Sequence, residues 1–170
     1  MTSATPPRPV AVAAAALGLG VTAGMRSQIP LALLAAKSNR AAGSLPPPLY
    51  LLRPKGVAIG LAMSAVGEAV GDKLPIAPSR LRPGPLVGRL SFGAAAGAVL
   101  ALGAGNAAGL GGTMAALGAL AGSMAGYTAR VQAHKATGLP DPLLAVLEDV
   151  VAVTIGLLSL SRWPADQVKR

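Results

Sequence analysis

Residues 142–160, PLLAVLEDVVAVTIGLLSL, decide the fold of this chain. This apolar stretch is long enough to cross a hydrocarbon core of about 30 Å as an α-helix. The sequence before it, Asp141 followed by Pro142, is typical of a helix N-cap with proline at the first helical position. The alternation of apolar and polar residues that marks a barrel strand is missing. We therefore predict a membrane-spanning helix that begins at Asp141.

Similar apolar stretches rich in Ala, Gly, Leu and Val occur throughout the chain. The predicted spans cover residues 10–25 with a continuation at 31–36, then 56–74, 86–105, 110–129 and 142–160. Pro30 interrupts the first of them, so we expect that helix to kink or end near Arg26. The pattern predicts an all-α polytopic membrane bundle of about five spans.

The composition agrees with a membrane protein. Hydrophobic residues make up 52% of the 170 positions and charged residues only 12%, whereas about a quarter of positions are charged in soluble domains. The net charge of +9 does not indicate nucleic-acid binding, because the scaffold is apolar and aromatic residues are only 2%. We predict a single transmembrane domain over residues 10–162, with a disordered N-terminal tail (1–9) and a C-terminal tail (163–170).

Two short sequence matches indicate an internal repeat. Ala23-Gly24-Met25 in the first span matches Ala125-Gly126-Tyr127 in the fourth, and residues 65–70 in the second match residues 145–150 in the fifth. Spans 1–2 would then be duplicated as spans 4–5 around a central span. Five crossings would give the two copies opposite orientations, an inverted repeat typical of secondary transporters. They would also place the two chain ends on opposite sides.

Carboxylates inside the predicted spans are the strongest candidates for a functional site. Glu68 and Glu148 lie within spans, where a charge costs roughly 2.5–3.5 kcal/mol on insertion scales. Arg26 and Arg130 lie at the ends of the neighbouring spans. We expect one Glu–Arg pair in each repeat, Glu68 with Arg26 and Glu148 with Arg130, at the interface between the repeats. The set of candidates for binding an ion or solute is Glu68, Glu148, Asp72, Asp149, Arg26 and Arg130.

A basic segment follows the second predicted span. Its cationic residues are Lys73, Arg80, Arg82 and Arg89. Attraction to anionic lipid headgroups is one interpretation, at about 1 kcal/mol per residue. The other is a phosphate or headgroup pocket, with Lys73, Ser79, Arg80 and Arg82 as its candidate residues. The basic residues are balanced between the two sides of a five-span protein, so their distribution does not orient it.

Glycines spaced four residues apart predict close contacts between helices, which lipid-embedded helices need for van der Waals packing. Gly118, Gly122 and Gly126 form the most regular set. Their face is the candidate surface for a homo-oligomer.

Catalytic and cofactor sites are not indicated. The chain contains no cysteine, which excludes disulfides, thiolate metal sites and cysteine nucleophiles. No hydrolase, nucleotide-binding or zinc-protease motif occurs, and the single histidine, His134, lies in a polar segment. We therefore expect a protein that is not an enzyme and has no catalytic residue, bound metal or cofactor.

Several motifs resemble a bacterial membrane protein family described as domain of unknown function 4126. They include AGMRS at 23–27, GDKLP at 71–75, PSR at 78–80, PGPL at 83–86 and LED at 147–149. The resemblance covers most of the chain and implies a multi-pass protein of the bacterial inner (cytoplasmic) membrane. It implies no activity, ligand or catalytic residue.

The sequence favours two functions over a membrane enzyme that acts on a lipid. The first is binding or transport of an ion or small polar solute at a repeat interface lined by Glu68 and Glu148. The alternative is a membrane scaffold or anionic-lipid-binding protein in which the Glu–Arg pairs are static. The expected partners are the lipid bilayer and anionic lipid headgroups, and not nucleic acid.

Overall fold

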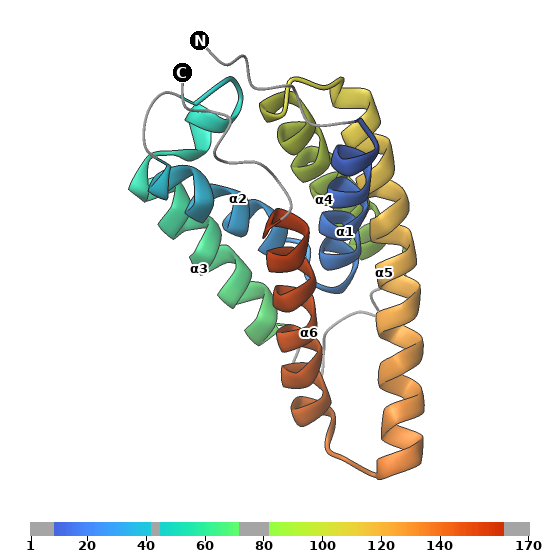
Figure 1. Ribbon diagram of the computed structural model, residues 1–170. Helices are drawn as coiled ribbons and strands as arrows, with labels where there is room; N and C mark the ends of the chain where they lie inside the picture. The colour runs from blue at the N-terminus through green and yellow to red at the C-terminus, as the bar shows by residue number, and fades with distance from the viewer. Residues whose placement is uncertain (1–8, 42–44, 72–81, 162–170) are drawn as a thin grey trace.

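The computed structural model of the chain describes residues 9–41, 45–71 and 82–161, and every regular element in these residues is helical. The elements are α1 (Pro9–Met25), α2 (Ile29–Arg40), a short 3-10 helix η1 (Leu49–Leu52), α3 (Lys55–Gly71), α4 (Pro83–Gly103), α5 (Ala108–Thr137) and α6 (Asp141–Ser161). They form one elongated bundle (Figure 1). Of the predicted tails (1–9 and 163–170), residues 1–8 and 163–170 lie outside the described residues, and Pro9 is the first residue of α1.

The described residues confirm an all-helical bundle with several helices that could cross a membrane. Three helices, α4, α5 and α6, are long and apolar enough to cross a bilayer, and α1 is a shorter apolar helix. The predicted apolar stretches correspond to α1, α3, α4, α5 and α6, which agrees with about five spans. The start of α6 at Asp141, with Pro142 in its first turn, is confirmed.

The first predicted span consists of two helices that run in opposite directions. As expected, α1 ends next to Arg26; α2 then begins at Ile29, with Pro30 in its first turn. The hydroxyl of Thr22 in α1 donates to the carbonyl of Ala152 in α6 at 3.3 Å, whereas Lys37 in α2 donates to the carbonyl of Leu160 at 2.6 Å. Further toward the start of α1, Gly18 lies against Ser159. Helix α1 is therefore antiparallel to α6, and α2 runs parallel to α6.

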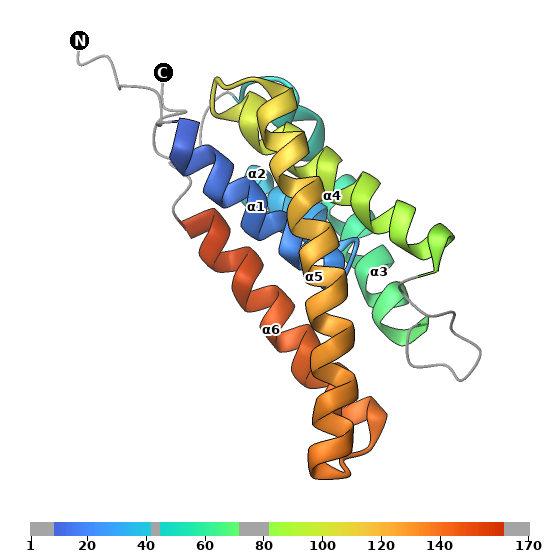
Figure 2. The ribbon, with the colours of Figure 1, turned by 90° about the vertical axis from the view of Figure 1, so that its right-hand side faces the viewer.

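This reversal changes the expected direction of the chain. Because α2 turns back along the bundle, the start of α1 and the end of α6 lie at the same end (Figure 2), so the expectation of opposite ends is wrong for these two helices. Moreover, α1 and α5 run side by side in the same direction, since Gly20 lies against Ala115 and Gly24 against Ser123. An inverted repeat requires opposite orientations, and this prediction is therefore wrong for these two helices. The prediction did not count α2 as a separate helix.

The core lies where α1, α4 and α5 meet, and glycines bring their backbones together. A Cβ atom on Gly20 would lie 2.0 Å from the carbonyl oxygen of Ala115, and one on Gly118 would lie 2.2 Å from that of Leu17. Helices α4 and α5 approach in the same way, since a Cβ on Gly97 would lie 2.2 Å from the oxygen of Gly111. Only glycine fits at such contacts.

The glycine face proposed for a homo-oligomer is used inside the chain. Gly118 and Gly122 pack against the backbone of α1, and Gly126 is buried on the same helix. The expected role of this face in joining two copies is therefore wrong, because α1 already covers it.

Helix α3 packs very differently from the core helices. None of its residues is buried. It lies along α2 (Figure 1) with a stripe of half-buried residues, Ala58, Leu61, Ala65 and Glu68. The other side of α3 is apolar and exposed within the chain, as expected for a surface that faces lipid or another protein.

Candidate functional site

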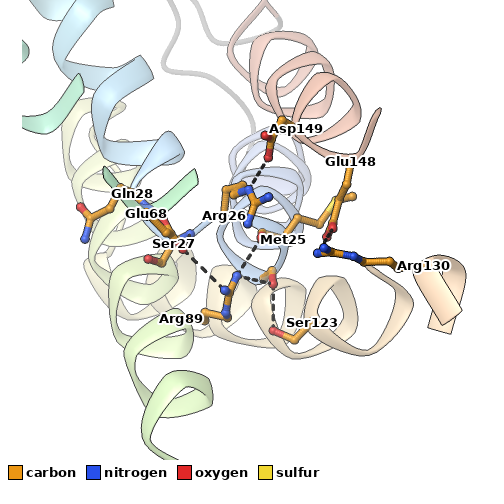
Figure 3. A network of polar contacts seen from close by, with 11 residues as sticks. Met25, Arg26, Ser27, Gln28, Glu68, Arg89, Ser123, Arg130, Glu148 and Asp149 are labelled. Atoms are coloured by element: carbon orange, nitrogen blue, oxygen red, sulfur yellow. Dashed lines mark hydrogen bonds and ion pairs between the residues drawn. The ribbon is translucent and has the colours of Figure 1, made fainter. Parts of the chain in front are cut away.

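Charged side chains from four helices gather around residues 26–28, which we name the α1–α2 turn. Glu68 reaches it from α3, Arg89 from α4, and Asp149 from α6; Arg130 and Glu148 lie close by, on the far side of the end of α1 (Figure 3). The turn breaks the helix inside the bundle, so its backbone groups need partners other than the usual helical hydrogen bonds. The side chains provide several of them.

Glu68 binds the backbone of the turn. The N–H of Ser27 donates to its Oε1 atom at 2.9 Å, and the N–H of Gln28 donates to its Oε2 atom at 3.0 Å. Both donors precede the first residue of α2, where the helix dipole also favours an anion. The guanidinium of Arg89 lies 3.6 Å from Oε1. Glu68 was expected to pair with Arg26, and this is wrong: its partners are the two backbone amides and Arg89.

Arg89 binds the other side of the helix break, at the end of α1. Its Nη1 donates to the carbonyl oxygens of Gly24 at 3.0 Å and Met25 at 2.7 Å, the last residues of α1. The hydroxyl of Ser123 in α5 donates to the same Gly24 oxygen at 3.1 Å. A cation beside the C-terminus of a helix is favoured by the helix dipole. Arg89 thus fixes the end of α1 and faces Glu68 at the same time.

The sequence interpretation placed Arg89 in a basic segment at the membrane surface, and this is wrong. The residue is only 5% exposed. Its position three residues inside the predicted span 86–105 was the signal that could have identified it, because a charged residue inside a span needs a partner. No comparable signal marked Ser123, since serine is common in membrane helices.

Arg26 is fully buried and pairs with Asp149 on α6. Because α1 and α6 are antiparallel neighbours, the end of α1 lies beside the middle of α6, and this brings Arg26 to Asp149. Asp149 was one of the candidate residues, but its pairing with Arg26 was not foreseen.

The expected pair between Arg130 and Glu148 is present. Nη1 of Arg130 lies 3.7 Å from Oε2 of Glu148, which is buried. Arg130 also binds Asp141, the first residue of α6, in a two-pronged ion pair whose Nε–Oδ1 distance is 2.7 Å. The Asp141 side chain is 61% exposed, against 7% for Glu148. Arg130 therefore connects the surface of the bundle to its interior.

Glu68 and Glu148 do not line one common interface, contrary to the expectation. They lie on opposite sides of the end of α1, with Met25 and Arg26 between them (Figure 3). The three arginines and four carboxylates in contact here carry a formal charge of −1 together. We name these seven residues the charge cluster: Arg26, Arg89, Arg130, Glu68, Asp141, Glu148 and Asp149.

Other predicted site residues fall outside the charge cluster. Asp72, Lys73, Ser79 and Arg80 lie outside the described residues. Arg82 is exposed immediately before α4. Within residues 9–41, 45–71 and 82–161, no group of three or more His, Cys, Asp or Glu side chains is placed to hold a metal ion.

Comparison with known proteins places the chain in a family but adds no chemistry. The model of a family described as domain of unknown function (DUF4126) matches residues 13–162. No curated protein and no solved structure matches the chain. The charge cluster lies wholly within the matched residues.

Proposed function

The chain belongs to the family of domain of unknown function 4126, and we propose that it binds an ion or small polar solute at the charge cluster and carries it across the bacterial cytoplasmic membrane. In this proposal the cluster has a binding role, and the protein is not an enzyme. Glu68 and Glu148 are the central carboxylates, and Arg26, Arg89 and Arg130 are their exchangeable partners.

One observation carries the proposal, namely that the helix break lies inside the bundle with charged groups at both helix ends. Glu68 faces the start of α2, and Arg89 faces the end of α1. Non-helical backbone at membrane depth is tolerated only where it is buried in protein or lines a polar cavity. Discontinuous helices whose ends face ions or substrate groups are typical of transporter binding sites.

Energetics also favour a binding role. Replacing a buried ion pair by apolar residues of similar volume is often neutral or stabilising. A cluster that includes the fully buried Arg26 is therefore a poor means of stabilising a bundle. Solute binding gives a physical reason for such an arrangement, because a bound ion or polar group needs charged partners in a low-dielectric interior.

The second candidate is a scaffold or anionic-lipid-binding protein, and one observation favours it. Glu68 already meets three donors within the chain, the amides of Ser27 and Gln28 and the guanidinium of Arg89. A static cluster of this kind would lock the helices together. This candidate further predicts anionic lipid retained on purification and lost when Arg80 and Arg82 are both changed to Gln.

Flux measurements in liposomes separate the two candidates. Purified protein is reconstituted, and uptake of protons, radioactive sodium, rubidium and small organic acids is compared for wild type, Glu68→Gln and Glu148→Gln. We expect wild type to carry one of these probes and both variants to fall to the level of protein-free liposomes while remaining folded. Lys135→Gln is the control, because Lys135 is exposed and lies outside the charge cluster; its uptake should equal that of wild type. If wild type carries none of the probes and the Gln variants lose only thermal stability, the scaffold is correct.

The same proposal includes an orientation in the cytoplasmic membrane. Basic residues of the described chain gather at the end of the bundle where α1 starts and α6 ends: Lys37, Arg40, Arg53 and Lys55. At the opposite end, outside the charge cluster, the described residues include Arg82 and Lys135. Because cytoplasmic loops carry an excess of Lys and Arg, we expect both ends of the chain in the cytoplasm. Green fluorescent protein should then fluoresce at either terminus and alkaline phosphatase should be inactive at both; activity at one terminus would contradict this.

A further inference from the structure

We infer that the α1–α2 turn and Arg89 form a binding site for a small monocarboxylate, in which the carboxylate of Glu68 is a tethered stand-in for the solute. This inference rests on the proposed function, because it names the chemical class of the solute. A carboxylate is already observed in the site, held through both of its oxygens by backbone N–H groups at 2.9 and 3.0 Å.

The donors of the site are held in place by groups other than Glu68. Arg89 is anchored by hydrogen bonds to the carbonyls of Gly24 and Met25. The Gly24 carbonyl is held in turn by Ser123. The donors of the turn are backbone groups between two helices, so their direction does not depend on a side chain. A guanidinium and two backbone amides that are fixed in advance form a preorganised receptor for a carboxylate.

The helix that carries Glu68 is the most loosely packed of the long helices. No residue of α3 is buried, and Glu68 is the residue that joins it to the α1–α2 turn. Glycines lie on either side, and a Cβ atom added to Gly67 or Gly71 would meet no atom within 4 Å. Moving α3 away from the turn would therefore disturb few contacts, whereas moving α1 would break the glycine packing of the core.

The exchange of Glu68 for a solute has a simple charge balance. The Glu68 carboxylate leaves the turn together with α3, and one monocarboxylate anion takes its place on the two amides and Arg89. The charge of the site is unchanged, and no buried cation is left unpaired, which would be costly. A carboxylate fits this receptor better than a spherical anion, because its two oxygens reach two separate N–H groups.

Chemical rescue tests the inference. The thermal stability of full-length Glu68→Ala in detergent is measured in sodium chloride, sodium acetate and sodium formate at equal sodium concentration. We expect the melting temperature in chloride to fall by about 6 °C or more relative to wild type. Acetate and formate should restore most of that loss. Glu148→Ala is the matched control, because its partner is the side chain of Arg130, which also binds Asp141; it should not be rescued.

The outcomes separate this inference from the proposed function. Equal stability of Glu68→Ala in all three salts, or equal rescue of Glu148→Ala, would overturn the monocarboxylate site even if liposome flux is observed. Rescue specific to Glu68→Ala supports the site, and it would do so even if no flux were found. If Glu68→Ala does not fold, Glu68→Gln is used in its place with the same salts. Calorimetry should then show that Glu68→Gln binds acetate, and the absence of binding would overturn the inference.

Discussion

The core of α1, α4 and α5 and the peripheral helix α3 are both rich in glycine, but they use it in opposite ways. A Cβ atom on Gly24 in α1 would lie 2.2 Å from the carbonyl oxygen of Ala119, whereas one on Gly60 in α3 would meet nothing within 4 Å. In lipid, close helix approach is a main source of stability. Glycine spacing therefore indicates a helix capable of close packing and does not show whether that helix is closely packed.

The two regions also differ in how charge joins them. The core helices meet along their length through small residues and backbone contacts, with Arg89 and Ser123 bound at the end of α1, whereas α3 reaches the α1–α2 turn with the carboxylate of Glu68. Polar contacts can exchange with a solute or with water, and close backbone packing cannot. We interpret the core as the rigid part of the molecule and α3 as the part that can move.

The largest expected effect is loss of folding when a core glycine gains a branched side chain. In Gly24→Val the new atoms would overlap the backbone of α5, which has no flexible group that can move aside. We expect no folded protein by size-exclusion chromatography in detergent. Gly56→Val in α3 is the matched control, because nothing lies within 4 Å of its Cβ position; it should elute as wild type. Normal folding of Gly24→Val would contradict the close packing of α1 on α5.

The sequence predicted the helices better than it predicted their partners. Apolar stretches and the Asp141-Pro142 start set the helices, because lipid requires long apolar segments with satisfied backbones. The pair between Arg130 and Glu148 was also predicted, since α5 and α6 are consecutive. The partners of Arg26 and Glu68 were not, because they depend on the direction of α2. Twelve residues of α2 were too few to count as a crossing by length alone.

The next effect concerns the buried pair of Arg26 and Asp149. Arg26→Leu leaves Asp149 without its buried partner, and we expect a loss of about 3–5 kcal/mol in the free energy of unfolding. The double variant Arg26→Leu, Asp149→Leu should recover much of this loss, because no charge is then left alone. Thermal melts of the two single variants and the double variant form a cycle that measures the coupling. Additive losses would show that the two residues do not form a pair.

A smaller effect is expected at the exposed end of the charge cluster. Asp141→Asn removes an ion pair with Arg130 in which Asp141 is 61% exposed, so we expect a loss of about 1 kcal/mol or less. Added salt should reduce the difference between this variant and wild type, since exposed charges are screened. The difference caused by Arg26→Leu should not change with salt, because Arg26 is fully buried. Equal salt dependence of both would contradict the division into a surface pair and a buried pair.

The smallest effect tests whether α3 is free of close neighbours in the membrane. Gly60→Ala adds a methyl group where the chain has open space, and alanine favours a helix over glycine by about 1 kcal/mol. In a bilayer, where lipid adapts to a methyl group, we expect the free energy of unfolding to rise by that amount or less. The rate of steric trapping or thermal melts in nanodiscs measure this change. Gly97→Ala on α4 should instead destabilise, since its Cβ would lie 2.2 Å from the oxygen of Gly111. If Gly60→Ala destabilised the protein in the bilayer but not in dilute detergent, another protein surface would have to pack against α3. An interface would then hold α3 in place, and α3 could not move as freely as its packing within one chain indicates.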